Sequence, residues 1–343
     1  MIAERLSAQL LAGAPATDPL AVVERLLAVQ GQDPRGARLA IRARSTALSA
    51  TDVDRALSEE RSLLITWVNR GTLHLLRSED YPWLHALTTP QLRRANARRL
   101  EQEGVSASGA ERAVAAIAAA LAAEGPLSRA QLRERIASAG VRTEGQALVQ
   151  LLRLASLRGM IVRGPIVGSQ HAYVLVHDWL GKPAPVQRER ALGELARRYL
   201  LGHGPADDRD LARWAGLTLT DARAGLQAIA RLLHERDDGL LDLASRPAPA
   251  AELPGPRLLG AFDPILLGWR SREALLDGNQ QVVTVNGLFR PFALIGGRAA
   301  ATWKLAGREV VLEPFSRLGQ ADADALLADG EDVLRYLMPA PGS

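Results

Sequence analysis

The spacing of apolar residues in the first part of the chain predicts short helices. Residues 1–46 divide into three of them, each with one apolar face. Asp18 followed by Pro19 is typical of a helix start and begins the second. The stretch from Gln30 to Pro34 is polar, so we expect the second helix to end there. A third helix should run from about Arg35 to Thr46.

The next segment has the alternation that is typical of a β-hairpin. A short helix capped by Ser49 or Thr51 is expected first. Within residues 63–77, LLITWV and TLHLL are strand-like, and Asn69-Arg70-Gly71 supplies the turn between them. Helices followed by such a hairpin form the outline of a winged helix.

The same outline recurs twice in the middle of the chain. Gly125-Pro126 and Gly204-Pro205 each precede a helix, and in both copies the first core leucine follows the glycine by seven residues. The copies lie 79 residues apart. A second helix follows in each, and the earlier copy then has strand-like runs at 160–164 and 171–176. We therefore predict a repeated helix–turn–helix–hairpin architecture.

The pattern changes to strands near the C-terminus. Residues 282–314 alternate between apolar and polar positions, with turns at Asn286-Gly287, Gly296-Gly297 and Ala306-Gly307. This pattern predicts an antiparallel sheet or a small barrel. A final helix is expected from about Ala321 to Leu337.

Together these elements predict an α+β fold with three tandem winged-helix (helix-turn-helix) motifs and a C-terminal antiparallel β-rich region. Linkers containing glycine and proline are expected at Asp178 to Gln187 and at Ser245 to Pro256. The expected segments are three winged helices and the β-rich region with its final helix, at residues 1–100, 110–178, 186–245 and 256–343.

The outer faces of the second helices in the repeats are rich in arginine and glutamine. These side chains make bidentate contacts to base edges or hold phosphates. The alternative is that they form the solvated face of an amphipathic helix, and for any single residue this is the better interpretation. The candidate DNA contacts on the outer faces, beside the middle copy and at the first hairpin turn are Gln146, Gln150, Arg153, Arg223, Gln227, Arg231, Arg142, Arg158, Arg163 and Arg70.

Composition adds few constraints. The 343-residue chain has no cysteine, which excludes disulfides and cysteine metal sites, and no apolar run long enough to span a membrane. Its N-terminus reads as an amphipathic helix and not as a signal peptide, so we expect a cytoplasmic location. Of 42 basic residues only Lys182 and Lys304 are lysine. A GC-rich genome explains this bias, although arginine also suits phosphate contacts.

Gln30 and Gln32 are the candidate catalytic residues. An amide does not titrate, but it can orient a water molecule and stabilise a cationic sugar. Those two actions are sufficient if the leaving group is already activated, as in an N7-alkylated purine. Asp33 follows directly and could supply a carboxylate, but a cap on the next helix, with Pro34 at its first position, is the favoured interpretation.

Five stretches of the sequence resemble a known family, the winged-helix DNA-binding-domain family that contains the AlkZ-like and YcaQ-like DNA glycosylases. The resemblance covers essentially the whole chain. It rests on VQGQDPRGA at 29–37, TWVNRGTLHLL at 66–76, YLLGHGPADDRDLARWAGL at 199–217, LLGAFDPILLGWRSR at 258–272 and NGLFRPFALIGGRAAATWK at 286–304.

The resemblance implies a DNA channel built from three winged helices, and excision of bulky N7-alkylguanine adducts and interstrand crosslinks. Its AlkZ-like branch uses a Gln-x-Gln pair, which corresponds here to Gln30 and Gln32, whereas the YcaQ-like branch has Asp at the second position. The residue between them is usually aliphatic in the family and is Gly31 here. Glycine loosens the backbone between the two amides.

The first interpretation is therefore a monomeric DNA glycosylase that acts on double-stranded DNA with alkylated bases and needs no cofactor and no metal. A non-catalytic DNA-binding protein, either a regulator or a damage sensor, is the alternative, and a protein-interaction scaffold is the third. His74 is expected to be a partly buried histidine. The more specific alternative is that it faces DNA or assists catalysis. The segment from Leu258 to Arg272 is either a packed corner or a DNA-facing loop.

Overall fold

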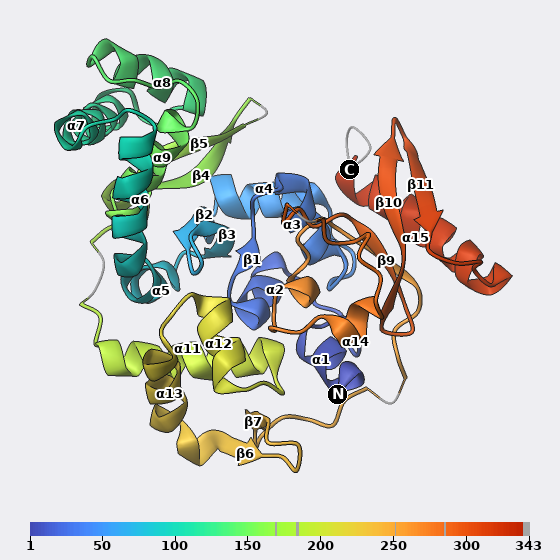
Figure 1. Ribbon diagram of the computed structural model, residues 1–343. Helices are drawn as coiled ribbons and strands as arrows, with labels where there is room; N and C mark the ends of the chain where they lie inside the picture. Colours follow the sequence, from blue (N-terminus) through green and yellow to red (C-terminus); the bar gives the residue numbers. More distant parts are fainter. Residues whose placement is uncertain (169, 183–184, 251, 285, 339–343) are drawn as a thin grey trace. The chain divides into compact units, whose positions relative to one another are not determined.

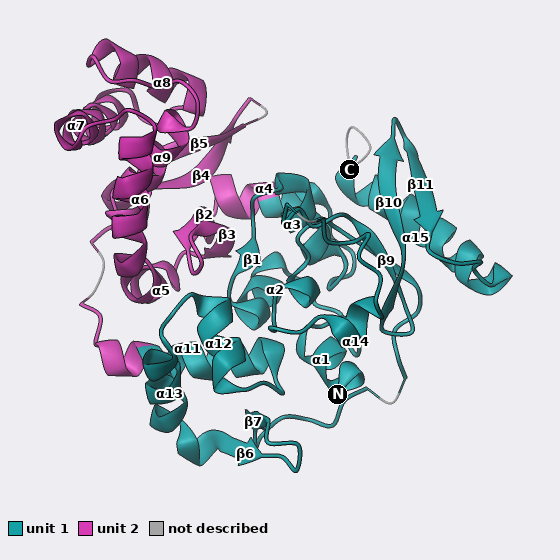
Figure 2. Cartoon of the chain, viewed as in Figure 1, with its two compact units in different colours: residues 1–53, 192–343 teal, residues 54–191 magenta. Residues whose placement is uncertain are grey.

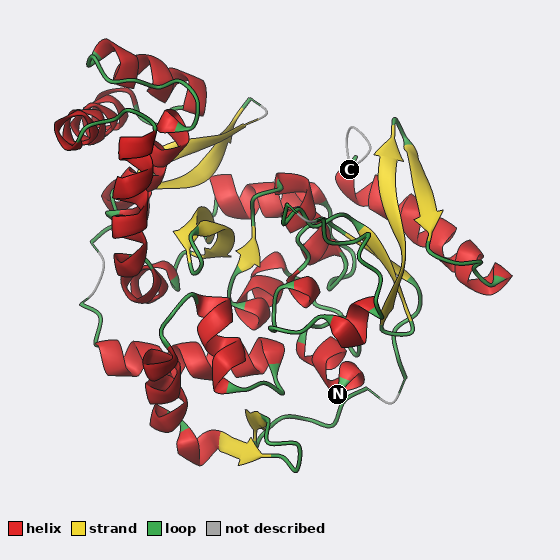
Figure 3. Ribbon diagram, viewed as in Figure 1, coloured by secondary structure: helices red, strands yellow, loops and turns green. Residues whose placement is uncertain are grey.

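The computed structural model describes residues 1–168, 170–182, 185–250, 252–284 and 286–338. It is a mixture of helices and antiparallel sheets (Figures 1 and 3). The chain divides into two compact units (Figure 2). Unit 1 comprises residues 1–53 and 192–343, and unit 2 comprises residues 54–191. These units are coarser than the four predicted segments, which remain a prediction.

Unit 2 contains a sheet in the order β3-β2-β4-β5, with antiparallel neighbours. The predicted hairpin at 63–77 is confirmed, because β2 pairs with β3 around a turn in which Asn69 and Gly71 have φ of 53° and 81°. Helix α4 (Ala50–Ser58) runs from unit 1 into unit 2, and α11 (Arg188–His203) begins in unit 2 but lies mostly in unit 1. The elements between them are β2 (Leu63–Val68), β3 (Thr72–Arg77), α5 (Tyr81–Thr88), α6 (Pro90–Gln102), α7 (Ala107–Glu124), α8 (Arg129–Ser138), α9 (Ala147–Leu157), β4 (Ile161–Val167), β5 (Gln170–Leu175) and α10 (Val176–Leu180).

Unit 1 begins with helices and ends with a sheet. Its elements are α1 (Ile2–Ala8), α2 (Pro19–Leu26), β1 (Val29–Gln30), α3 (Pro34–Arg42), α12 (Asp208–Ala215), α13 (Leu219–Ala228), η1 (Ala230–Leu232), β6 (Leu233–Glu235), β7 (Leu241–Leu243), β8 (Arg257–Leu259), η2 (Pro264–Leu266), α14 (Glu273–Leu276), β9 (Phe292–Ile295), β10 (Arg298–Ala306), β11 (Glu309–Pro314) and α15 (Gln320–Leu337).

The order of two helices followed by a hairpin occurs three times along the chain, at α3 to β3, α8 to β5 and α12 to β7. The winged-helix interpretation of these segments remains a prediction. The second helix was predicted too long. It ends at Leu26 because Leu27 takes a φ of 64°, which no right-handed helix accepts, and the chain then becomes extended at β1.

The C-terminal sheet is open and not a barrel in the residues described. Its order is β11-β10-β9-β8, so β11 and β8 are its two edges. The first predicted strand is only an isolated bridge between Val283 and Phe289; Val285, beside the Asn286-Gly287 turn, lies outside the described residues. Figure 3 shows α15 lying along this sheet, which confirms the predicted final helix.

The core of this part of unit 1 joins the sheet to α3. The buried side chains that form it come from α3, β8, β9, β10 and α15, and they are Leu39, Leu258, Ala293, Ala301, Trp303, Leu326 and Val333. Helix α3 is therefore fixed to the C-terminal sheet by packing. Within the described residues no single helix is long and apolar enough to cross a membrane; α6 and α7 meet the length and composition only as a pair bent by 108°.

Candidate functional site

The two glutamines of the predicted site lie on the short segment between α2 and α3, and they contact each other. Gln30 Nε2 donates a hydrogen bond of 2.5 Å to Gln32 Oε1. Gln30 ends β1 and is 5% exposed, whereas Gln32 is exposed. The prediction placed them at the end of a helix; instead Gln30 lies on the strand β1 and Gln32 in the bend before α3. One amide is therefore anchored inside the protein, and it holds the other at the surface.

Helix α2, which precedes the pair, is fixed by α11. A Cβ atom on Gly202 would lie 2.2 Å from the carbonyl oxygen of Arg25, so only glycine permits this approach. Arg198 Nη2 donates to the carbonyl oxygen of Glu24 at 2.7 Å, and Arg198 itself is 4% exposed. These contacts fix the last turn of α2, and with it the direction in which the chain enters β1.

Helix α3, which follows the pair, starts as predicted. Asp33 is its N-cap and accepts a hydrogen bond of 2.9 Å from the backbone N–H of Arg35, and Pro34 occupies the first position. The favoured interpretation of Asp33 as a cap is confirmed. Its carboxylate thus shapes the backbone on the C-terminal side of Gln32.

Two of the sequence stretches that carry the family resemblance meet at α3. A Cβ atom on Gly36 would lie 2.4 Å from the carbonyl oxygen of Ala261, and one on Gly260 would lie 3.0 Å from Gly36 Cα. Neither glycine was predicted to have a role, although both stand inside the quoted stretches. They let the start of α3 touch the segment after β8 backbone to backbone.

Two buried arginines fix the C-terminal end of α3, and neither was predicted from the sequence. Arg44 donates to both carboxylate oxygens of Asp263, and both side chains are 0% exposed. Arg42 pairs with Asp329 and Asp332 of α15. Burial alone would lower the pKa of Arg42, but the hydrogen bonds and charges of these carboxylates raise it. Nothing in the sequence pattern marks partners more than 200 residues apart.

The contacts of Asp263 show whether the segment from Leu258 to Arg272 is a packed corner or a DNA-facing loop. Its side chain accepts from Arg44 and from the backbone N–H of Ile265, and Trp269 beyond it is buried. Arg270 is held by Asp207 and Asp210, with nitrogen–oxygen distances of 2.7 and 3.3 Å. The segment is a packed corner, as the first of the two interpretations held.

The candidate DNA contacts near the start of α9 differ in their exposure and in their contacts with other side chains. Arg142 and Gln146 are exposed, and Arg142 lies 3.8 Å from Glu144. Gln150 is half-buried, and its Oε1 accepts a hydrogen bond of 2.9 Å from Asn96 of α6. The side chain of Gln150 therefore helps to hold α6 against α9, and of these residues it is the least available to DNA.

The three arginines farther along α9 and on β4 are all in contact with protein groups, although Arg158 is exposed. Arg158 forms a bidentate pair with Glu111. Arg163 of β4 lies over the rings of Trp67 and Tyr173, at 5.0 and 4.8 Å. Arg153 is half-buried beneath the first hairpin turn, since a Cβ atom on Gly71 would lie 2.2 Å from Arg153 Nη2. Burial lowers the pKa of Arg153.

Arg70 lies in that same turn and is partly exposed. Its charge also acts on His74, which is 2% exposed and donates from Nδ1 to the carbonyl oxygen of Thr72 at 3.0 Å. Burial lowers the pKa of His74 to about 3, and the charge of Arg70 contributes. His74 is therefore a neutral, buried histidine, which confirms the first interpretation of this residue.

The three remaining candidates belong to unit 1, as do the two glutamines. Arg223 on α13 is exposed, and its Nε donates to Asp208 at 2.7 Å. Gln227, one turn later, is also exposed. Arg231 was expected on the same helix, but α13 ends at Ala228 and Arg231 lies exposed in the following 3₁₀ turn. In the part of the chain that the structure describes, no three histidine or carboxylate side chains gather to hold a metal ion.

Comparison with known proteins identifies the family. The sequence is 28% identical over 350 residues to an interstrand DNA cross-link repair glycosylase of Streptomyces sahachiroi, across 94% of this chain and 92% of that one. The structure is similar to that of the Streptomyces sahachiroi DNA glycosylase AlkZ, with a TM-score of 0.77 and 25% identity over 98% of this chain and 95% of that one. The sequence model described as DNA glycosylase AlkZ-like matches residues 23–336. The chain therefore belongs to the AlkZ-like DNA glycosylase family.

Proposed function

We propose that this protein is a monofunctional DNA glycosylase that hydrolyses the N-glycosidic bond of N7-alkylated purines in duplex DNA. The observation that carries the proposal is the hydrogen-bonded pair of Gln30 and Gln32. By the resemblance of the sequence, it corresponds to the Gln-x-Gln pair of the AlkZ-like branch. The family match supports glycosylase activity itself.

The reaction needs no general acid. Alkylation at N7 makes the purine cationic, so the bond between C1′ and N9 breaks with its electron pair moving to N9, which neutralises the base. The sugar becomes an oxocarbenium-like cation. Water attacks C1′ and loses a proton to solvent, which leaves an abasic site and the free alkylated base.

Two neutral amides can stabilise the sugar cation and orient the attacking water. The carbonyl dipole of an amide stabilises a nearby positive sugar, and its oxygen can accept a hydrogen bond from the attacking water. Gln30 donates to Gln32 Oε1 and so fixes the orientation of the second amide before substrate arrives. Positioning of this kind replaces the proton transfer that other hydrolases require.

The proposed substrates are bulky natural-product adducts, among them interstrand crosslinks. The relative from Streptomyces sahachiroi, a cross-link repair glycosylase by name, supports this assignment. A bulky lesion reached from a groove does not require deep base flipping. We further propose that the protein acts as a monomer in the cytoplasm, and that Arg70, Arg142, Gln146, Gln227 and Arg231 contact DNA first, because the structure leaves them exposed or partly exposed.

A duplex with a single N7-methylguanine tests the reaction class. The expected products are free 7-methylguanine and a strand that breaks only after alkaline treatment, since a monofunctional enzyme leaves the abasic site intact. An identical duplex with N6-methyladenine, whose base carries no charge, is the matched control and should stay unchanged. If the methyl adduct is not released, a duplex with one bulky N7 adduct follows. Failure of both substrates would favour the alternative, a non-catalytic DNA-binding protein.

A further inference from the structure

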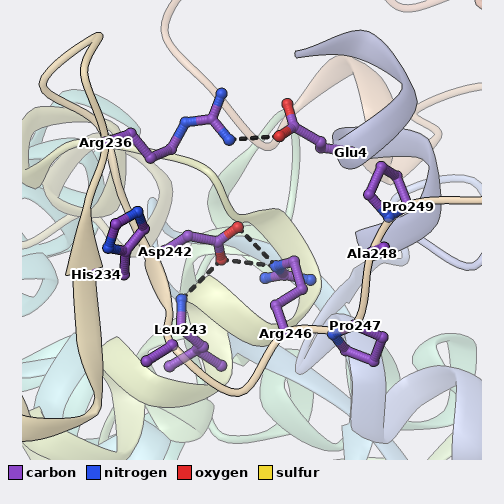
Figure 4. Close-up of a pocket in the computed structure, with 10 residues that line it drawn as sticks. Glu4, His234, Arg236, Asp242, Leu243, Arg246, Pro247, Ala248 and Pro249 are labelled. Atoms are coloured by element: carbon purple, nitrogen blue, oxygen red, sulfur yellow. Dashed lines mark hydrogen bonds and ion pairs between the residues drawn. The ribbon is translucent and has the colours of Figure 1, made fainter.

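Two adjoining cavities lie in unit 1, and neither Gln30 nor Gln32 lines them. They measure about 350 and 470 Å³ and share walls formed by Glu4, Leu243, Arg246 and the segment 247–249. Figure 4 shows the smaller one, with the segment 247–249 along one side. Sites of this size typically bind small molecules.

Most of the larger cavity is apolar. The segment 247–250 runs along it and is tied to α1, because the backbone N–H of Ala250 donates to Ser7 Oγ at 3.1 Å. The apolar residues of its wall include Leu10, Ala12, Ala14, Leu201, Leu243 and Pro247. The hydrophobic part of an organic ligand would be stabilised against these side chains.

Two of the arginines in the walls are already neutralised. Arg246 Nε lies 2.6 and 2.8 Å from the two carboxylate oxygens of Asp242, and the two side chains are 11% and 10% exposed. Arg236 donates to Glu4 and to Asp238. Figure 4 shows Arg246 with Asp242 and Arg236 with Glu4 as two separate pairs. Neither guanidinium lacks a counter-charge.

Arg25 is different. It lines the larger cavity from the last turn of α2 and is half-buried, and within the described residues its side chain has no hydrogen bond and no ion pair. Burial lowers the pKa of Arg25, the charge of Arg246 lowers it further, and Glu24 opposes them only in part. The end of the helix dipole offers about half a charge at most. A partly desolvated cation in this position favours an anion beside it.

We propose that this cavity binds a small organic anion, with an apolar body against the walls and one phosphate or carboxylate group on Arg25. Arg236 and Arg246 already have carboxylate partners, so Arg25 is the guanidinium of the wall that would receive this group. The site is independent of the glycosylase reaction and stands even if that reaction is not found.

Calorimetric titration of the full-length protein with 1-naphthyl phosphate tests the site. Saturable binding of one molecule per chain is expected. 1-Naphthol, which lacks the charge, and inorganic phosphate, which lacks the apolar body, should each bind at least about tenfold more weakly. Arg25→Gln should weaken binding of 1-naphthyl phosphate by about tenfold or more, which is the usual effect of losing a charge-assisted hydrogen bond. Arg317→Gln removes an exposed positive charge outside both cavities and should bind like the wild type.

A second variant, Ala14→Trp, tests the site even if Arg25→Gln does not fold. Ala14→Trp retains every charge but fills part of the larger cavity, so it should also weaken binding while the thermal unfolding midpoint stays near that of the wild type. Absence of saturable binding to the wild type would overturn the proposal, as would unchanged affinity in Arg25→Gln. Displacement of the probe by an undamaged duplex would also overturn it, because the site would then hold a DNA phosphate.

Discussion

The guanidinium of Arg44 and the carboxylate of Asp263 form two parallel hydrogen bonds, of 2.7 and 2.9 Å, with no solvent exposure on either side chain. The remaining donors of Arg44 reach the backbone and side chain of Gln9 and the carbonyl oxygen of Ala40. One arginine therefore joins the end of α1, the end of α3 and the corner at Asp263. This junction holds the helix that follows Gln30 and Gln32.

Loss of Arg44 should destabilise the protein strongly. Arg44→Met leaves the carboxylate of Asp263 buried without a counter-charge, and such a change lowers the free energy of unfolding by about 3–5 kcal/mol. The matched control is Arg298→Met, because Arg298 pairs with Asp277 at the surface, where both side chains are more than 60% exposed. That change should cost less than about 1 kcal/mol. Equal losses in urea unfolding would show that the buried pair has no special structural role.

A methyl group on Gly36 should disturb the site without touching either glutamine. The Cβ atom of Gly36→Ala would lie 2.4 Å from the carbonyl oxygen of Ala261, so α3 must move. We expect a destabilisation of about 1–3 kcal/mol and slower base excision. Gly255→Ala is the control, since nothing lies within 4 Å of the added methyl group. Full activity in Gly36→Ala would mean that the position of α3 does not matter for the pair.

The sequence reveals those parts of the site that depend on local structure. Asp18 and Asp33 were both predicted as caps, because a cap contacts a backbone N–H two residues away. The end of α2 was placed too late, since Leu27 adopts its positive φ where α2 packs against Gly202 of α11. The pairing of Arg44 with Asp263 spans 219 residues, and no local pattern encodes it. Its residues stand out only once the fold brings them together.

The buried His74 should make stability depend on pH. Its pKa is lowered to about 3 by burial and by Arg70, whereas in the unfolded chain it has its ordinary value of about 6.5. The unfolded state thus binds a proton first, so the contribution of His74 is complete above about pH 7 and is lost progressively as pH falls toward 3. The loss should reach several kcal/mol, roughly 5.

This dependence can be measured by urea unfolding at pH 7.5 and 5. His74→Gln, which cannot titrate, should show a smaller loss between the two pH values than the wild type. His234→Gln replaces an exposed histidine and should behave like the wild type. An unchanged pH dependence in His74→Gln would assign the effect to other groups, such as the buried His85, whose pKa burial also lowers.

The exposed Arg231 in the 3₁₀ turn after α13 should contribute to DNA binding through its charge. Arg231→Ala should weaken binding of undamaged duplex DNA and reduce the slope of log affinity against log salt by about 1, because one phosphate contact is lost. Gln227→Ala carries no charge change and should leave the slope intact. Arg317→Ala, remote from this helix in the sequence, provides the control for a non-specific loss of positive charge. A slope that falls equally in both arginine variants would remove Arg231 from the interface.

We propose that Gln30 and Gln32 act together in excision. The most direct test is single-turnover release of 7-methylguanine from a methylated duplex by the wild type, Gln30→Ala and Gln32→Ala, with DNA affinity measured in parallel. Gln320→Ala, an exposed glutamine on α15, is the control and should excise normally. We expect excision to fall by at least about a hundredfold in both site variants while affinity is retained, as is typical when a preorganised polar group is removed. Excision at the wild-type rate in either variant would contradict a joint role of the two glutamines.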